Sequence, residues 1–139
     1  MTDLAKEYGI HAMRTSLPAE PAEEDPDEQL GAELTLYREL CRSAHATIVG
    51  AGIKTTDGLW GMPMLNRLNT TSLCQLLENI PEGCWELMTH PGYPFLQGRS
   101  FDGPQRQIEL QALLSAEAKE IVPRRRIQLC TFGELLCAS

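Results

Sequence analysis

Three short apolar runs in this chain have the pattern of β-strands, and helical segments separate them along the sequence. The strand-like runs cover residues 10–13, 84–89 and 127–131. Helical spacing, with apolar residues at three- and four-residue steps, covers residues 29–49, 71–79 and 104–114. Such alternation predicts an α/β fold with parallel strands and crossover helices.

Turn and cap residues mark the ends of these segments. Gly9 is expected to end a short helix over residues 3–9, and Thr71-Ser72 to cap the helix over 71–79. Ser115 is expected to begin one more short helix. The stretch TTDGLWGM, rich in Gly and Thr, is expected to be a loop.

The small number of strands limits what the chain can form. Both faces of a parallel sheet must be covered, and three strands make a small sheet. The length of 139 residues suits one domain and is short for two typical cores. We therefore expect a single domain over residues 1–139 that is part of a larger barrel or of an obligate oligomer.

Charge is concentrated in one segment. The chain has a net charge of −7, and residues 20–28 carry six carboxylates and no base. This composition predicts an acidic, flexible loop over residues 15–28. The remainder is close to neutral, which argues against a nucleic-acid partner. No run is long and apolar enough to span a membrane, and no leader pattern begins the chain, so we expect a cytoplasmic protein.

The five cysteines, at positions 41, 74, 84, 130 and 137, include no CxxC pair. In a cytoplasmic protein they are expected to be reduced. Zinc sites of the finger type need close Cys/His pairs, and the chain has none, so no metal ligands are assigned.

The segment ELMTHPGYP carries the clearest chemical signal. His90 follows the strand-like run 84–89 and lies on a Pro/Gly turn. Ligands of α/β folds bind at the carboxyl ends of strands, and histidine, with an unperturbed pKa of about 6.5, is suited to proton transfer. The alternative is a histidine that only makes hydrogen bonds within its turn.

Several segments together resemble a known family. ELMTHPGYP is followed by Arg106, by Glu109-Leu110 and by a late FGEL, and the chain also contains LAKEYGIHAMR and GIKTTDGLWG. This set resembles the C-terminal half of the YdjC/ChbG-like carbohydrate deacetylases, which include hopanoid-biosynthesis-associated members. The resemblance covers most of the chain outside the acidic loop.

The resemblance implies a TIM-barrel-like (β/α) fold and metal-dependent hydrolysis of an N-acetyl amino sugar, with Mg or Zn as the divalent ion. His90 matches the family histidine that acts as general acid toward the leaving amine. Arg14 and Arg106 match recurrent family arginines and are expected, with Trp60 and Tyr93, to bind the amino-sugar or oligosaccharide substrate. Either arginine can equally belong to a structural ion pair, and Trp60 can equally be a core residue.

The chain departs from the family at the metal site. The family ligands are an Asp-Asp pair, a histidine and a His-x-His-x-His cluster, all upstream of the LAKEYGIHAMR match, and His11 and His45 do not match them. We therefore expect a chain that lacks the catalytic metal ligands and is inactive alone, and that forms a homodimer or pairs with a separate N-terminal half. A non-enzymatic sugar- or partner-binding module is the alternative. A metal-free hydrolase with Cys84 or Cys130 as nucleophile is a weaker one.

Overall fold

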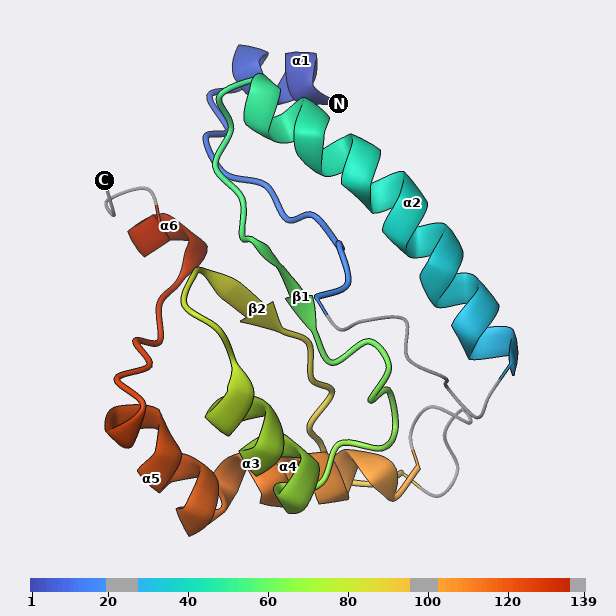
Figure 1. Cartoon of the computed structure of the whole chain (residues 1–139), viewed down its shortest axis with the longest axis vertical. Helices are drawn as coiled ribbons and strands as arrows, with labels where there is room; N and C mark the ends of the chain where they lie inside the picture. The colour runs from blue at the N-terminus through green and yellow to red at the C-terminus, as the bar shows by residue number, and fades with distance from the viewer. Residues whose placement is uncertain (20–27, 96–102, 136–139) are drawn as a thin grey trace. The chain divides into compact units, whose positions relative to one another are not determined.

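The computed structural model of the chain describes residues 1–19, 28–95 and 103–135 (Figure 1). The elements follow in the order α1 (Thr2–Glu7), α2 (Glu28–Gly50), β1 (Gly58–Trp60), α3 (Thr70–Asn79), β2 (Trp85–Leu87), α4 (Gln105–Leu114), α5 (Ala116–Arg124) and α6 (Phe132–Leu135). The chain divides into two compact units. One contains Met1–Pro63, Gly83–Leu87 and Cys130–Ser139, and the other contains Met64–Glu82 and Met88–Leu129.

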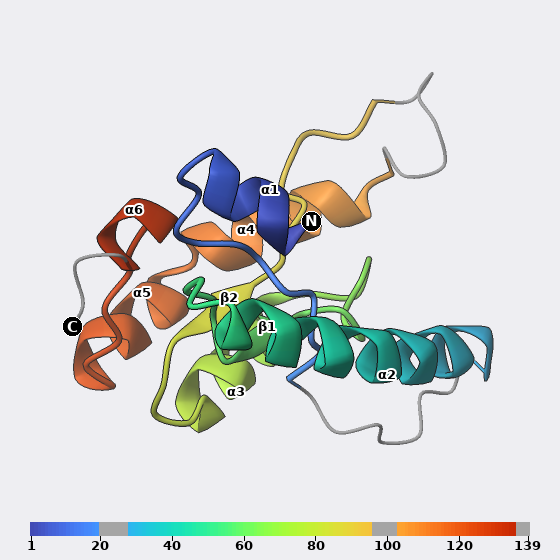
Figure 2. The same ribbon diagram turned by 90° about the horizontal axis from the view of Figure 1, so that it is seen from above.

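The first unit is built on parallel strands. β1 and β2 pair in parallel, with Leu59 opposite Glu86 (Figure 1). The segment before α2 runs along the other side of β1, because Ala12 and Pro18 form parallel bridges to Lys54 and Leu59. The helix α2, which is continuous in Figure 2, lies in the chain between this extended segment and β1. The described residues thus contain mixed helices and a small parallel sheet, as an α/β class requires.

The end of α1 lies next to the small apolar core of the first unit. Gly9, at φ 66°, ends α1, and the Ile10 N–H reaches back to the carbonyl of Ala5 at 2.7 Å. This arrangement is the usual glycine-based helix end, in which a left-handed residue lets free carbonyls be satisfied. Ala5 then packs with Ile48 of α2 and Ile53.

Asp57 and Gly83 join the beginnings of β1 and β2. The Asp57 N–H donates to the carbonyl of Cys84, and Asp57 Oδ2 accepts the Cys84 N–H, both at 2.7 Å. Gly83 has a φ of 137°, and a Cβ there would lie 2.7 Å from Asp57 Oδ2. Only glycine therefore fits between the two strands at this point.

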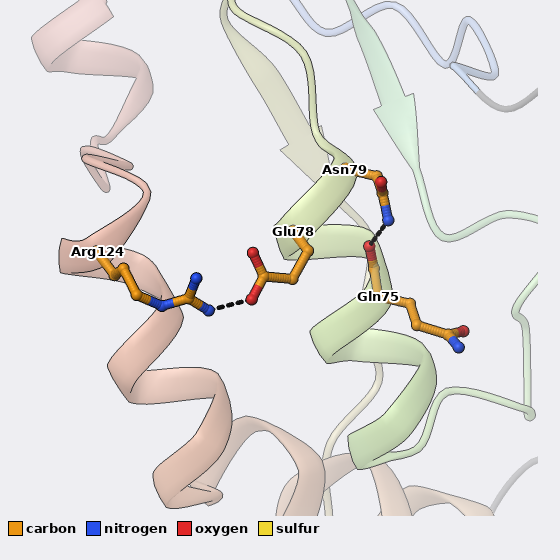
Figure 3. Close-up of polar contacts among 4 residues, drawn as sticks. All are labelled: Gln75, Glu78, Asn79 and Arg124. Carbon is orange, nitrogen blue, oxygen red and sulfur yellow. Dashed lines mark hydrogen bonds and ion pairs between the residues drawn. The ribbon is translucent and has the colours of Figure 1, made fainter.

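The second unit is a group of three helices. α3 packs on both α4 and α5, and α4 also contacts α5. Their buried apolar residues are Leu73, Leu76, Ala112, Ala118 and Ile121. An ion pair between Glu78 of α3 and Arg124 of α5 spans the edge of this core (Figure 3). Both side chains are more than a third exposed, so the apolar contacts contribute most of the stability.

The helix predictions are confirmed: α2, α3 and α4 lie where the apolar spacing indicates, and α5 follows Ser115. Ser115 caps α5 by accepting the Ala118 N–H at 3.3 Å. The cap of α3 is a correction, because Asn69, and not Thr71-Ser72, is the N-cap and forms a capping box with Ser72.

The strand predictions fare less well. β2 falls within the run 84–89, but residues 10–13 make only a bridge. The prediction of a strand over 127–131 is wrong: no strand is assigned there. The Ile127 N–H instead bonds to the carbonyl of Val122 at 2.9 Å and closes α5, with Arg126 at φ 57°. Arg125 and Arg126 thus form an exposed turn after α5, with no strand after it.

The loop predictions have mixed outcomes. The loop predicted for TTDGLWGM is wrong in its centre, which forms β1. Of the acidic loop 15–28, residues 15–19 are extended beside β1, residues 20–27 lie outside the described residues, and Glu28 begins α2. No helix in the described part of the chain combines the length and apolar character needed to cross a membrane.

Candidate functional site

The turn that carries His90 is held by the helix α4. The main-chain N–H of His90 donates to Glu109 Oε2 at 2.6 Å. Two residues later, the N–H of Gly92 donates to the carbonyl of Arg106 at 3.1 Å. Both bonds use the backbone of the turn. α4 therefore fixes the main chain of the His-Pro-Gly sequence on both sides of Pro91.

The face of α4 that meets this turn combines a buried acid with an arginine. Glu109 is 3% exposed, and Arg106, three residues earlier, lies on the same face of the helix. A Cβ on Gly92 would lie only 3.0 Å from Arg106 Nε. The turn can thus approach the guanidinium closely because residue 92 has no side chain.

Arg14 forms an ion pair with Glu86 of β2. The arginine side chain is 58% exposed and that of Glu86 is 15% exposed, so the pair lies at the edge of the first unit. Glu86 Oε2 is buried and has no hydrogen-bond partner among the described residues. The structure thus supports the ion-pair alternative for Arg14, and one oxygen of Glu86 can accept a further donor.

The two aromatic candidates occupy different settings. Trp60 ends β1 and packs edge-on against Trp85, with ring centroids 5.9 Å apart and planes at 69°. It is half-buried, and its Nε1 is buried without a partner in the part of the chain that the structure describes. Tyr93 is 79% exposed. Tyr93 is therefore accessible to a ligand, whereas Trp60 is partly a packing residue.

The five residues selected from the sequence fall into two groups. Arg14 and Trp60 belong to the first unit, and His90, Tyr93 and Arg106 belong to the second. Within the second unit, the structure brings the His90 turn and Arg106 together. It places Arg14 on Glu86 and Trp60 on Trp85 in the first.

Comparison with known proteins identifies the family. Residues 1–124 match the family described as YdjC-like protein. The chain belongs to this family. It is also similar to a carbohydrate deacetylase of Brevibacillus brevis, with 36% identity over 87 residues, which is 60% of this chain and 35% of that protein. The chain thus aligns with about a third of the length of this relative. No solved structure gives a significant match.

The described residues of this YdjC-like protein do not fit a divalent metal. No group of three or more His, Cys, Asp or Glu side chains lies close enough together, within residues 1–19, 28–95 and 103–135, to hold one. His45 instead places Nδ1 3.2 Å from the Thr15 hydroxyl. No reaction step can be assigned to a metal held by these residues.

A groove of about 690 Å³ in the second unit lies along α3 and α5, and its lining includes Glu78 and Arg124. None of the residues selected from the sequence lines it. The residues selected from the YdjC-like motifs therefore lie outside this groove, in the His90 turn, on α4 and near β1 and β2.

The sequence reasoning did not select two carboxylates that contact the candidate site residues. Glu86 is the one acidic residue in the apolar run CWELM, and Glu109 occupies the motif position after Arg106. A carboxylate within an apolar run is a usable signal, since burying a charge is costly unless it is hydrogen-bonded or paired. The sequence does not show the partners, however, because Glu86 pairs with Arg14 and Glu109 with the His90 N–H, both distant in the chain.

The cysteines of this YdjC-like protein do not favour thiol chemistry. Cys41, Cys74, Cys84 and Cys130 are free, and Cys137 lies outside the described residues. Burial raises the pKa of the Cys84 thiol, and the nearby Cys130 and Asp57 raise it further. Because the thiolate is the nucleophile, a raised pKa opposes the role of Cys84 in a metal-free hydrolase.

We expect Cys84 to react slowly with iodoacetamide in the folded chain. Its raised pKa reduces the thiolate fraction at pH 8, so the rate should keep rising at pH values where the urea-unfolded chain has levelled off. Cys41, whose pKa burial also raises, should behave likewise. Peptide mass spectrometry across a pH series measures both. Equal pH profiles in the folded and unfolded chains would contradict the shifts.

Proposed function

We propose that the chain forms the proton-donor and sugar-binding part of a metal-dependent N-acetyl amino-sugar deacetylase. Family membership and the similarity to a protein named carbohydrate deacetylase support this class of activity. The observation that carries the proposal is the His90 turn, whose main chain is bonded to α4 at His90 and at Gly92. A fixed main chain is what a proton donor needs in order to meet its substrate in one geometry.

In this proposal His90 protonates the leaving group. The imidazolium donates a proton to the amide nitrogen as the C–N bond of the acetamide breaks, so that the amino sugar leaves as a neutral amine and acetate forms. General acids of this kind contribute about 10²- to 10⁴-fold to a rate. A divalent ion such as Mg or Zn supplies activation of the attacking water in enzymes of this chemistry, and its ligands are proposed to come from outside the described residues.

Sugar contacts are proposed for two side chains in each unit, with each unit considered by itself. Arg106 and Tyr93 adjoin the His90 turn, and Arg14 and Trp60 lie in the first unit. Guanidinium groups and aromatic rings suit a substrate with many hydroxyls and flat apolar faces. A TIM-like (β/α) barrel is the proposed complete fold, with the small parallel sheet as part of its wall.

The metal-binding side is proposed to come from a separate N-terminal half, and a homodimer is the alternative assembly, which would cover strand edges without adding metal ligands. The chain aligns with 35% of the Brevibacillus relative, which leaves most of that protein without a counterpart in the alignment. A separate metal-binding half would also explain why the described residues contain the family's histidine turn but no cluster of metal-ligating side chains.

Sugar binding by the chain itself tests the proposal without any need for turnover. N,N′-diacetylchitobiose should change the tryptophan fluorescence in a saturable way, because only Trp60 and Trp85 emit and they contact each other. Trp60→Phe should lose the change and Trp85→Phe should keep it. Cellobiose, which lacks the acetamide, serves as the control ligand. The absence of any saturable change, or an equal response to cellobiose, would contradict the proposed substrate class.

A further inference from the structure

We infer that Glu109 is the positioning residue of the proposed proton donor. Its carboxylate holds the main-chain N–H of His90 and thereby sets where the imidazole can lie. The inference rests on the proposed function of His90 as general acid. The contact itself is a property of the fold and can be measured separately.

The contact has the features of a strong bond. Glu109 Oε2 and His90 N are 2.6 Å apart, and Glu109 is 3% exposed. Hydrogen bonds with an ionised acceptor are shorter than neutral ones and roughly twice as strong. Burying a carboxylate is costly unless it is hydrogen-bonded, so the buried Glu109 favours the arrangement in which it accepts the His90 N–H.

A second contact keeps the turn from pivoting about the first. The N–H of Gly92 donates to the carbonyl of Arg106, one helical turn before Glu109, and the Arg106 guanidinium lies against Gly92. Pro91, between the two bonded residues, has a fixed φ. With both ends held and the middle stiff, the turn has little freedom to move on α4.

The position of the bond separates this role from general support of the fold. Glu109 bonds to the backbone of His90 itself, so a shift of the turn moves the imidazole directly. A displacement of about 1 Å in a reacting group can cost about 100-fold in rate. Gln at position 109 keeps an acceptor oxygen in the same place, Asp withdraws it by one methylene, and Ala removes it.

The first arm of the test is NMR of the full chain. In ¹⁵N-labelled protein the His90 amide proton should lie strongly downfield and exchange slowly with solvent. Glu109→Gln should move it upfield while exchange stays slow, and Glu109→Ala should make exchange fast and multiply or broaden the imidazole signals. If Glu109→Ala does not fold, Glu109→Asp, which withdraws the acceptor oxygen by one methylene, should likewise speed the exchange of the His90 amide proton.

A matched control comes from Glu134. Its Oε2 also accepts a backbone N–H at 2.6 Å, from Thr131, but at an exposed site in the other unit. Glu134→Gln should change the Thr131 amide and leave the His90 signals as they are. A His90 amide that is unaffected by Glu109→Ala would overturn the inference, whatever the chain catalyses.

The second arm measures acetate release once the deacetylase is assembled with its metal-binding part. Glu109→Ala should lower kcat by about 10- to 100-fold with little change in KM, and Glu109→Gln should restore most of it. An altered His90 amide with an unchanged kcat would overturn the positioning role. If the wild-type assembly releases no acetate, the proposed function fails, and the amide signals still decide whether Glu109 fixes the turn.

Discussion

Replacing His90 with alanine should lower acetate release by the assembled deacetylase by about 10²- to 10⁴-fold, the usual contribution of a general acid. Without the imidazole, the amide nitrogen must leave unprotonated or take its proton from water. The loss should fall on kcat more than on KM, because proton donation stabilises the transition state and contributes little to binding the ground-state sugar.

The fold should tolerate this change. The bond from residue 90 to Glu109 uses the main-chain N–H, which alanine retains, so the turn keeps its contact with α4. His11→Ala, at an exposed histidine of the first unit, is the matched control and should leave turnover unchanged. A His90→Ala enzyme with full turnover would show that the histidine only stabilises its turn.

Leu73→Ala should strongly destabilise the second unit. Leu73 is 2% exposed and is the largest fully buried side chain among the described residues. Truncating such a leucine leaves a cavity and costs about 2–5 kcal/mol. Domains of this size are stable by about 5–15 kcal/mol, so the variant should lose a large share of its stability. Urea unfolding followed by circular dichroism measures the loss.

Leu77, one turn later on α3, provides the comparison. It is only partly buried, so Leu77→Ala should cost clearly less than Leu73→Ala. The two variants have the same change in helix propensity, and the difference therefore reports packing alone. Equal losses would mean that the α3, α4 and α5 core does not centre on Leu73.

The helices could be predicted because their signals are local. α2 and α4 contain apolar residues at helical spacing over two turns or more, and Ser115 ends α4 and caps α5. The cap of α3 shows the limit of this reasoning. Asn69, Thr71 and Ser72 are all good N-cap types, and the choice among them depends on backbone geometry that the residue types do not set.

The strands were harder because their stability comes from partners distant in the sequence. β1 has three residues, too few for an alternating pattern, and it is a strand because β2 and the segment before α2 lie on either side of it. Residues 127–131 show the reverse case. They alternate like a strand, but the turn at Arg126 closes α5 and the segment that follows has no strand pairing.

The sequence indicated several of the candidate site residues, but it did not indicate which residues they contact. The motif around His90 and the position of Arg106 emerged from the sequence, and the structure brings their backbones together. The bond from His90 to Glu109 and the ion pair from Arg14 to Glu86 could not be deduced, because each joins residues from different elements. Contacts of this kind are fixed by tertiary packing and not by local residue type.

Acetate release from N-acetylated chito-oligosaccharides, with Mg²⁺, Zn²⁺ or Co²⁺ added, tests the central claim most directly. The full chain would be assayed alone and together with the part of the Brevibacillus deacetylase that lies outside the matched region. We predict no release from the chain alone, and metal-dependent release from the pair that His90→Ala abolishes. A pair that assembles but releases no acetate, or release that does not depend on His90, would contradict the account.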